Sequence, residues 1–69
     1  MNFTKHAEQR MVERNISRRD VIATLTNAKA HAVRESFKNP GTFMVFGVAG
    51  LVVVVNRSAD ILTTYRETN

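Results

Sequence analysis

The chain lacks cysteine altogether, and its 69 residues include only one proline and three glycines. The absence of cysteine excludes a disulfide framework and a cysteine-ligated zinc site, the usual supports of very small folds. The longest mainly apolar segment, residues 43–55, is too short to span a membrane and is interrupted by Gly47 and Gly50. The N-terminus lacks the basic-then-apolar layout of a secretion signal. We therefore expect one domain, residues 1–69, of a soluble cytoplasmic protein.

Several catalytic signatures are also missing from the sequence. It contains no glycine-rich phosphate loop, no G-x-S-x-G motif and no carboxylate pair at a spacing typical of glycosidases. Two histidines without cysteine make a poor metal site, so we expect neither a metal nor another cofactor. The ten Lys and Arg residues exceed the six Asp and Glu residues, for a net charge of +4. This balance favours a polyanionic partner, either nucleic acid or an acidic protein.

The first part of the chain, residues 4–27, has a helical pattern. Phe3, Ala7 and Met11 recur every four residues, which is the spacing of one buried stripe on a helix. Thr4 suits the N-cap of this helix, and Asn15 suits the left-handed position that ends it.

A second helix is predicted to begin after Ser17. Ser17 and Asp20 have the spacing of a capping box, in which Asp20 replaces the usual Glu. The predicted apolar face of this helix consists of Val21, Ile22, Leu25 and Ala28.

After residue 30 the pattern becomes typical of strands. We predict strands over residues 31–37, 42–46, 51–55 and 61–66, separated by turns at residues 39–41, 47–50 and 57–60. The short connections favour antiparallel neighbours, because a parallel crossover needs a dozen or more residues. The predicted fold is α+β, with two N-terminal helices packed on a four-stranded antiparallel β-sheet. In the last strand, alternation places Ile61, Thr63 and Tyr65 on one face and Leu62, Thr64 and Arg66 on the other.

A cluster of basic residues lies on the first predicted helix. His6, Arg10 and Arg14 are spaced i, i+4 and i+8, so they share one side of the helix, next to the apolar stripe. We expect them at the margin between helix and sheet. A histidine there can transfer protons, and arginines can neutralise charge on a phosphate. The alternative is a solvated helix on which Arg10 and Arg14 pair with acidic neighbours such as Glu13.

Other candidate residues lie further along the chain. Arg18 and Arg19 stand at a helix start, where free N–H groups attract anions, although two exposed arginines on a capped helix explain them equally well. Tyr65 can stack on a base or donate to a phosphate oxygen, or it can be a strand aromatic at the edge of the core. His31 is a second candidate proton carrier, or an exposed histidine on a strand.

The N-terminal motif resembles a known family. His6-Ala7, Arg10-Met11, Arg14, Ile16-Ser17 and Asp20-Val21 match the pattern H-A-x-x-R-M-x-x-R-x-I-S-x-x-D-V of the domain of unknown function 4258 (DUF4258) family, and Thr63-Thr64-Tyr65 matches its closing T-x-Y strand. The resemblance implies kinship with RelE-type toxins and with the barnase, EndoU and colicin nucleases. These share helices packed on a four-stranded antiparallel sheet. It therefore implies metal-independent RNA cleavage, in which the 2′-hydroxyl attacks the adjacent phosphate.

The same resemblance assigns roles to individual residues. His6 would be the acid–base residue, Arg10 would stabilise the phosphate, and Arg14 would support either role. Thr63 and Tyr65 would orient the substrate, with Tyr65, His31 or an arginine as the second proton carrier. The candidate catalytic residues are His6, Arg10 and Tyr65, and the candidate substrate-binding residues are Arg14, Arg18, Arg19, Thr63 and Arg66.

We therefore predict a small RelE/barnase-like ribonuclease toxin whose partners are RNA and an acidic antitoxin. A non-catalytic module of the same fold, binding nucleic acid or acting as a phage-encoded inhibitor of a host protein, is the first alternative. A helix-turn-helix that reads DNA ranks last, because its turn is very short and Val21, Ile22 and Leu25 are needed for the core. Exposed strand edges at residues 31–37 or 61–66 would allow a homodimer.

Overall fold

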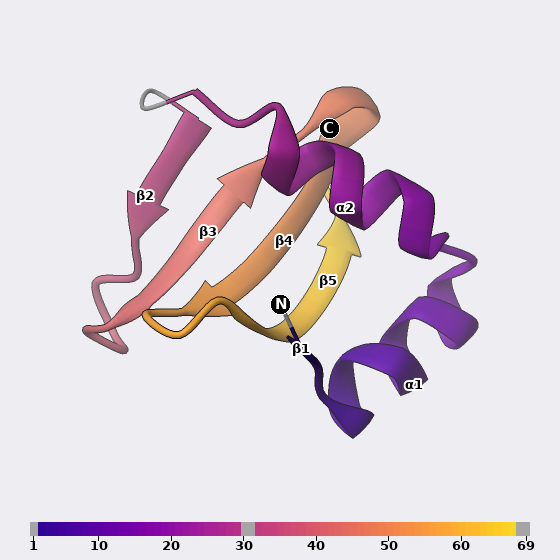
Figure 1. The fold of residues 1–69 in the computed structure, drawn as a ribbon, viewed down its shortest axis with the longest axis horizontal. Helices are drawn as coiled ribbons and strands as arrows, with labels where there is room; N and C mark the ends of the chain where they lie inside the picture. The colour runs from indigo at the N-terminus through magenta and orange to yellow at the C-terminus, as the bar shows by residue number, and fades with distance from the viewer. Residues whose placement is uncertain (1, 30–31, 68–69) are drawn as a thin grey trace.

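The computed structural model describes residues 2–29 and 32–67 and has an α+β fold, with two helices on one face of a five-stranded sheet (Figure 1). The elements in chain order are β1 (Asn2–Phe3), α1 (Lys5–Arg14), α2 (Arg18–Thr26), β2 (Val33–Glu35), β3 (Thr42–Phe46), the 3₁₀ turn η2 (Val48–Gly50), β4 (Leu51–Asn56) and β5 (Asp60–Arg66). The strand order is β1-β5-β4-β3-β2. No helix in the described ranges is long and apolar enough to cross a membrane.

The sheet differs from the four-stranded antiparallel sheet that the sequence predicts. A fifth strand, β1, pairs in parallel with β5, with Asn2 opposite Asp60 and Phe3 opposite Ile61. Phe3 therefore belongs to a strand and not to the helical stripe. Thr4, with φ −68° and ψ 160°, is still extended, so the helix begins at Lys5, two residues after Phe3. The other strand pairs are antiparallel, as predicted.

The predicted capping residues delimit both helices, but α2 ends at Thr26, so Ala28 lies beyond the helix whose apolar face it was predicted to join. The Thr4 hydroxyl accepts a hydrogen bond from the Ala7 N–H at 3.2 Å, and the Ser17 hydroxyl accepts one from the Asp20 N–H at 3.1 Å. Asn15 adopts the left-handed conformation, with φ 54° and ψ 49°, and turns the chain from α1 into α2.

The strand predicted over residues 31–37 is shorter in the structure. β2 ends at Glu35, and the Ser36 N–H makes one further hydrogen bond across to β3, to the Thr42 carbonyl at 2.7 Å. The chain then turns: the Asn39 N–H donates to the Ser36 hydroxyl at 3.3 Å, and the Thr42 N–H donates to the Asn39 carbonyl at 3.0 Å. Position 31 lies outside the described residues.

A β-bulge in β5 changes which side chains face the helices. Val54 lies opposite Thr63, whereas Val55 lies opposite Ile61, so Leu62 is the extra residue. As a result Ile61 and Thr64 are both fully buried, whereas Thr63 and Tyr65 are half-buried on the opposite face. The prediction that Ile61, Thr63 and Tyr65 share one face was wrong. The buried Thr64 hydroxyl donates to the Val52 carbonyl at 2.8 Å.

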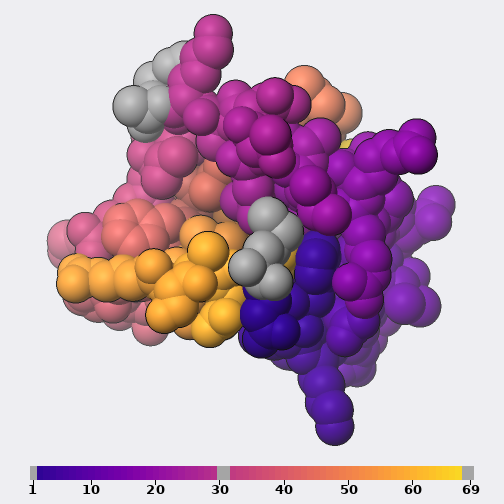
Figure 2. All heavy atoms as spheres, viewed as in Figure 1, coloured from indigo at the N-terminus to yellow at the C-terminus, as the bar shows by residue number. Residues whose placement is uncertain are grey.

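The core lies between the helices and one face of the sheet, and Figure 2 shows the side on which the helices cover it. Its buried members are Ala7, Met11, Ile16 and Val21 from the helical half and Val45, Leu51, Val53, Val55 and Ile61 from the strands. Ile22 was predicted to belong to it, but 42% of its surface is exposed. One position after Val21, its side chain points about 100° around the helix axis and away from the sheet.

Two glycines with positive φ allow a stability prediction. Gly41 (φ +88°) has open space around it: a Cβ added there would have the Arg57 Nε, at 3.7 Å, as its nearest neighbour. At Gly50 (φ +78°) a Cβ would lie 2.2 Å from the Glu67 carbonyl oxygen. Gly41→Ala should lower the free energy of unfolding by only about 1–2 kcal/mol, which is the cost of placing a residue with a Cβ in the left-handed conformation. Gly50→Ala should cost clearly more, because the backbone at Glu67, directly after β5, must also move. Urea unfolding of both variants measures the difference, and equal losses would contradict the predicted clash.

Candidate functional site

An open cleft of about 640 Å³ lies between α1 and the C-terminal half of β5. Its walls are formed by His6, Arg10 and Arg14 from α1 and by Thr63, Tyr65 and Arg66 from β5. The structure thus brings together six of the eight candidate residues. The helix supplies its three through the i, i+4, i+8 stripe beside the buried Ala7 and Met11, and β5 supplies Thr63 and Tyr65 through the bulge at Leu62.

Hydrogen bonds at both ends of α1 set the shape of this cleft. At the start of the helix, the N–H and the hydroxyl of Thr4 both donate to the Ile61 carbonyl, at 3.2 and 2.7 Å. At its end, Arg14 Nη1 donates to the Thr64 carbonyl at 2.8 Å. The helix therefore runs beside β5 at a fixed distance. Arg14 uses one of its five N–H donors in this contact, and the others remain for the cleft.

Arg10 has an acidic partner on the same helix. Its Nη1 donates to Glu13 Oε1 at 2.6 Å, and 34% of the Arg10 side chain and 45% of the Glu13 side chain are exposed. The hydrogen bond from Arg10 is the main cause that lowers the pKa of Glu13, with a further hydrogen bond from Gln9. Of the two arginines that the sequence suggested could pair with acidic neighbours, Arg10 does so, with Glu13. Such exposed pairs are weak, so a phosphate can compete for this guanidinium.

The two proton-bearing groups of the cleft come from its two walls. His6 is exposed on α1, and Tyr65 is half-buried on β5. The Tyr65 hydroxyl contacts Met44 Sδ at 4.0 Å, so its ring lies over the sheet while it lines the cleft. His31, the other candidate proton carrier, lies outside the described residues. With three guanidinium groups, an imidazole, a phenol and a hydroxyl, the cleft can bind a phosphodiester and exchange protons with it.

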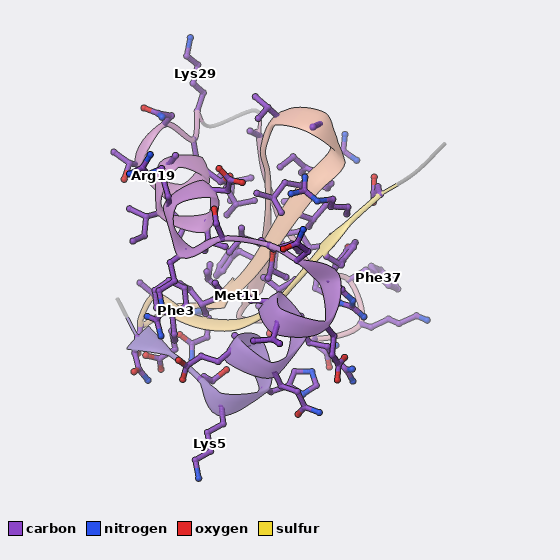
Figure 3. The ribbon with its side chains drawn as sticks, turned by 90° about the vertical axis from the view of Figure 1, so that its right-hand side faces the viewer. Phe3, Lys5, Met11, Arg19, Lys29 and Phe37 are labelled. Atoms are coloured by element: carbon purple, nitrogen blue, oxygen red, sulfur yellow. The ribbon has the colours of Figure 1, made fainter. Side chains whose placement is uncertain are left out.

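Arg18 and Arg19 do not line the cleft. Arg18 forms an ion pair with Glu8, and its guanidinium carbon lies 4.5 Å from the centroid of the Phe3 ring. Arg19 is exposed on α2, where Figure 3 shows it well apart from Lys5 at the start of α1. Arg18 therefore links the helix pair to β1, a contact that no local sequence signal reveals.

A second pocket, of about 570 Å³, escaped the sequence analysis. It lies between α2 and the β3–β4 connection, and its walls include Ala23, Ala28, Val48, Ala49 and Leu51, with Asp20, Lys29 and Arg66 also on its lining. The residues come from three separate segments and form no motif, so no sequence signal could have identified the pocket. Arg66 lines both this pocket and the cleft.

The Arg10–Glu13 contact leads to a prediction about protonation. Replacing Arg10 by Gln should raise the pKa of Glu13 towards its ordinary value, because the dominant hydrogen bond to the carboxylate is lost. In the unchanged protein the ion pair exists above the pKa of Glu13 and is lost as the pH falls through it, which releases Arg10. An NMR titration of the carboxyl carbon measures both values. Arg18→Gln, which removes a different ion pair, should leave the pKa of Glu13 unchanged. An unaltered Glu13 titration in Arg10→Gln would refute the contact.

The Arg14 anchor leads to a prediction about stability. Arg14→Met keeps the apolar stem but removes the hydrogen bond to the Thr64 carbonyl, and it should cost about 1.5 kcal/mol. Arg19→Met is the matched control, since Arg19 has no hydrogen-bond or ion-pair partner among the described residues. Its loss should stay below about 0.5 kcal/mol in urea unfolding. If both variants unfold alike, Arg14 does not hold α1 to β5.

Comparison with known proteins identifies the family. The profile of one family, described as Domain of unknown function (DUF4258), matches residues 3–66, which is nearly the whole chain. No match was found among curated proteins or among solved structures. The matched range begins in β1 and ends with the last residue of β5. It includes both helices, and with them the N-terminal motif that runs from His6 to Val21. The chain therefore belongs to the DUF4258 family.

Proposed function

We propose that the protein is a metal-independent endoribonuclease of the toxin type, which cleaves RNA at the α1–β5 cleft. The observation that carries this proposal is the composition of the cleft, which is lined by three guanidinium groups together with an imidazole and a phenol. This set suits a phosphodiester, because the substrate is anionic and its cleavage needs a base, an acid and positive charge.

The proposed reaction is a transesterification within the RNA. One proton carrier removes the proton of the 2′-hydroxyl, whose oxygen then attacks the adjacent phosphorus. The bond from phosphorus to the 5′-oxygen breaks, a 2′,3′-cyclic phosphate forms, and the other carrier donates a proton to the departing 5′-oxygen. His6 and Tyr65 fill these two roles from opposite walls of the cleft. Arg10 stabilises the charge on the phosphoryl oxygens after exchanging Glu13 for the substrate.

The other residues of the cleft bind and orient the RNA. Arg14 and Arg66 contact neighbouring phosphates, and Thr63 positions the ribose. None of the six residues that line the cleft is a carboxylate, the ligand class that hard cations prefer, and the residues supply positive charge themselves. Helices on one face of a largely antiparallel sheet also support the proposed kinship with RelE-type toxins and with the barnase, EndoU and colicin nucleases. Such an activity would require a cytoplasmic site of action and an acidic antitoxin as partner.

A binding module without catalysis is the second candidate. Two of the three arginines in the cleft already have partners, Arg10 with Glu13 and Arg14 with the Thr64 carbonyl. Groups held in this way suit stable binding of a polyanion or of an acidic host protein as well as they suit catalysis.

Cleavage of single-stranded RNA in the presence of EDTA tests the proposal. The unchanged protein should produce 2′,3′-cyclic phosphate ends. His6→Ala and Arg10→Ala should each slow cleavage about 10²- to 10⁴-fold, as expected for the loss of a proton carrier or of charge stabilisation. Arg19→Ala, outside the cleft, should cleave normally, and circular dichroism checks that every variant is folded.

Intact RNA after incubation with the unchanged protein would overturn the catalytic proposal. Binding would then separate the remaining possibilities. Affinity for RNA that falls steeply with salt supports a nucleic-acid-binding module, because bound counterions are released from the phosphates. Absence of RNA binding favours a protein partner.

A further inference from the structure

The face of the sheet opposite the helices carries its own set of side chains. Strand alternation and register place there the residues that do not belong to the core: Arg34 of β2, Thr42, Met44 and Phe46 of β3, Val52, Val54 and Asn56 of β4, and Thr63 and Tyr65 of β5. We call this set the open face. It is continuous with the cleft, because Thr63 and Tyr65 belong to both.

Aromatic side chains dominate one end of the open face. Phe46, Val52 and Tyr65 stand side by side on β3, β4 and β5. Val52 is fully buried although it is not a member of the core cluster under the helices, so its neighbours on the open face cover it. The contact of Tyr65 with Met44, at 4.0 Å, shows that the ring leans across β4. Phe46 and Tyr65 nevertheless remain half-exposed.

Most of the charges around the open face are positive. Arg10, Arg14 and Arg66 line the cleft at its β5 side, and Arg34 is exposed at its β2 side. Two carboxylates lie at the margin, and both have partners: Glu13 pairs with Arg10, and Asp60 accepts a hydrogen bond from Asn56. None of the nine residues that form the face is acidic. Like charges would meet if a second copy of the chain docked here, which disfavours a dimer through this face. The aromatic rings of this face, with arginines on either side, instead suit a ligand that has unpaired bases and a negatively charged backbone.

An exposed phenylalanine extends this pattern. Phe37, in the β2–β3 loop, is 99% exposed and is followed by Lys38. Figure 3 shows Phe37 on the side of the molecule away from Arg19 and α2. The loop therefore adds another aromatic side chain and a positive charge beyond the far edge of the sheet.

The geometry points to single-stranded RNA as the ligand of this surface: its bases stack on Phe46 and Tyr65 of the open face while its backbone enters the α1–β5 cleft. This inference rests on the proposed function and names its substrate class, since bases paired in a duplex are not free to stack on protein rings. Stacking also suits a sequence-tolerant enzyme, because every base has a flat face.

Tyr65 provides a test that needs no substitution. It is the only tyrosine and the chain has no tryptophan, so the intrinsic fluorescence of the protein reports on Tyr65. A 2′-O-methyl oligonucleotide of about eight nucleotides is a suitable probe, because it covers a typical single-strand site and lacks the attacking hydroxyl. It should quench this emission on binding. An abasic strand with the same number of phosphates should not, and N-acetyltyrosinamide corrects for light absorbed by the bases.

A matched pair of variants tests the other ring. Phe46→Leu keeps an apolar side chain but removes the ring from the open face, and it should weaken binding of the 2′-O-methyl strand about ten-fold. Phe43→Leu makes the same change on the helix-facing side of β3, where Phe43 packs against the core. It should leave the affinity unchanged. Neither variant should alter the affinity for the abasic strand.

The outcomes separate this inference from the proposed function. Equal affinity for the base-containing and abasic strands, equal affinity for single strands and duplexes, or equally effective competition by polyglutamate would each overturn the inference in favour of simple charge attraction or an acidic protein partner. Base-dependent quenching with no cleavage of unmodified RNA would leave the inference standing and the proposed function refuted. If the unchanged protein cleaves RNA but Phe46→Leu binds the 2′-O-methyl strand with unaltered affinity, the proposed function stands and the inference is refuted.

Discussion

The attachment of α1 to the outer edge of β5 is the contact on which the rest of the structure depends. β1 covers that edge only at Asp60 and Ile61, so the β5 carbonyls beyond Ile61 that point away from β4 have no partner strand. Thr4 and Arg14 bind the Ile61 and Thr64 carbonyls from the two ends of α1. A helix held in this way packs along the β5 side of the sheet, with Ala7 and Met11 in the core. α2 covers β3 and β4, and a cleft remains along the seam between α1 and β5.

This arrangement combines structural and chemical roles in the same side chains. Arg14 satisfies a backbone carbonyl and also lines the cleft, and Tyr65 packs against Met44 while it faces the same space. In a chain of 69 residues the core is thin, and few side chains are available for function alone. The arginines are divided between these structural and chemical roles. Arg18 stabilises the contact between the helices and Phe3, whereas Arg10, in a weak exposed pair, can exchange its partner for a ligand in the cleft.

Features encoded by local signals could be predicted from the sequence. Thr4, Asn15 and Ser17 delimit the helices through contacts within three or four residues, so their sequence neighbourhood suffices to find them. The stripe of His6, Arg10 and Arg14 follows from helix geometry in the same way. The pairing of β1 with β5 could not be predicted, because two residues carry no periodicity and their partners are almost sixty positions away. The capture of Arg18 by Phe3 and Glu8 is likewise a tertiary contact between surfaces that only the fold brings together.

The bulge at Leu62 decides which side chains at the end of β5 face the core and which face the cleft. With a regular ladder, Thr63 and Tyr65 would turn under the helices beside Ile61, and Thr64 would face outwards. Removing one residue would thus exchange the inner and outer side chains of half a strand, while the composition, net charge and N-terminal motif stayed the same. The number of residues between Ile61 and Tyr65 therefore determines which side chains of β5 face the cleft, independently of their identity. In related sequences, the spacing between Ile61 and the closing T-x-Y is as informative about the site as the identity of the residues.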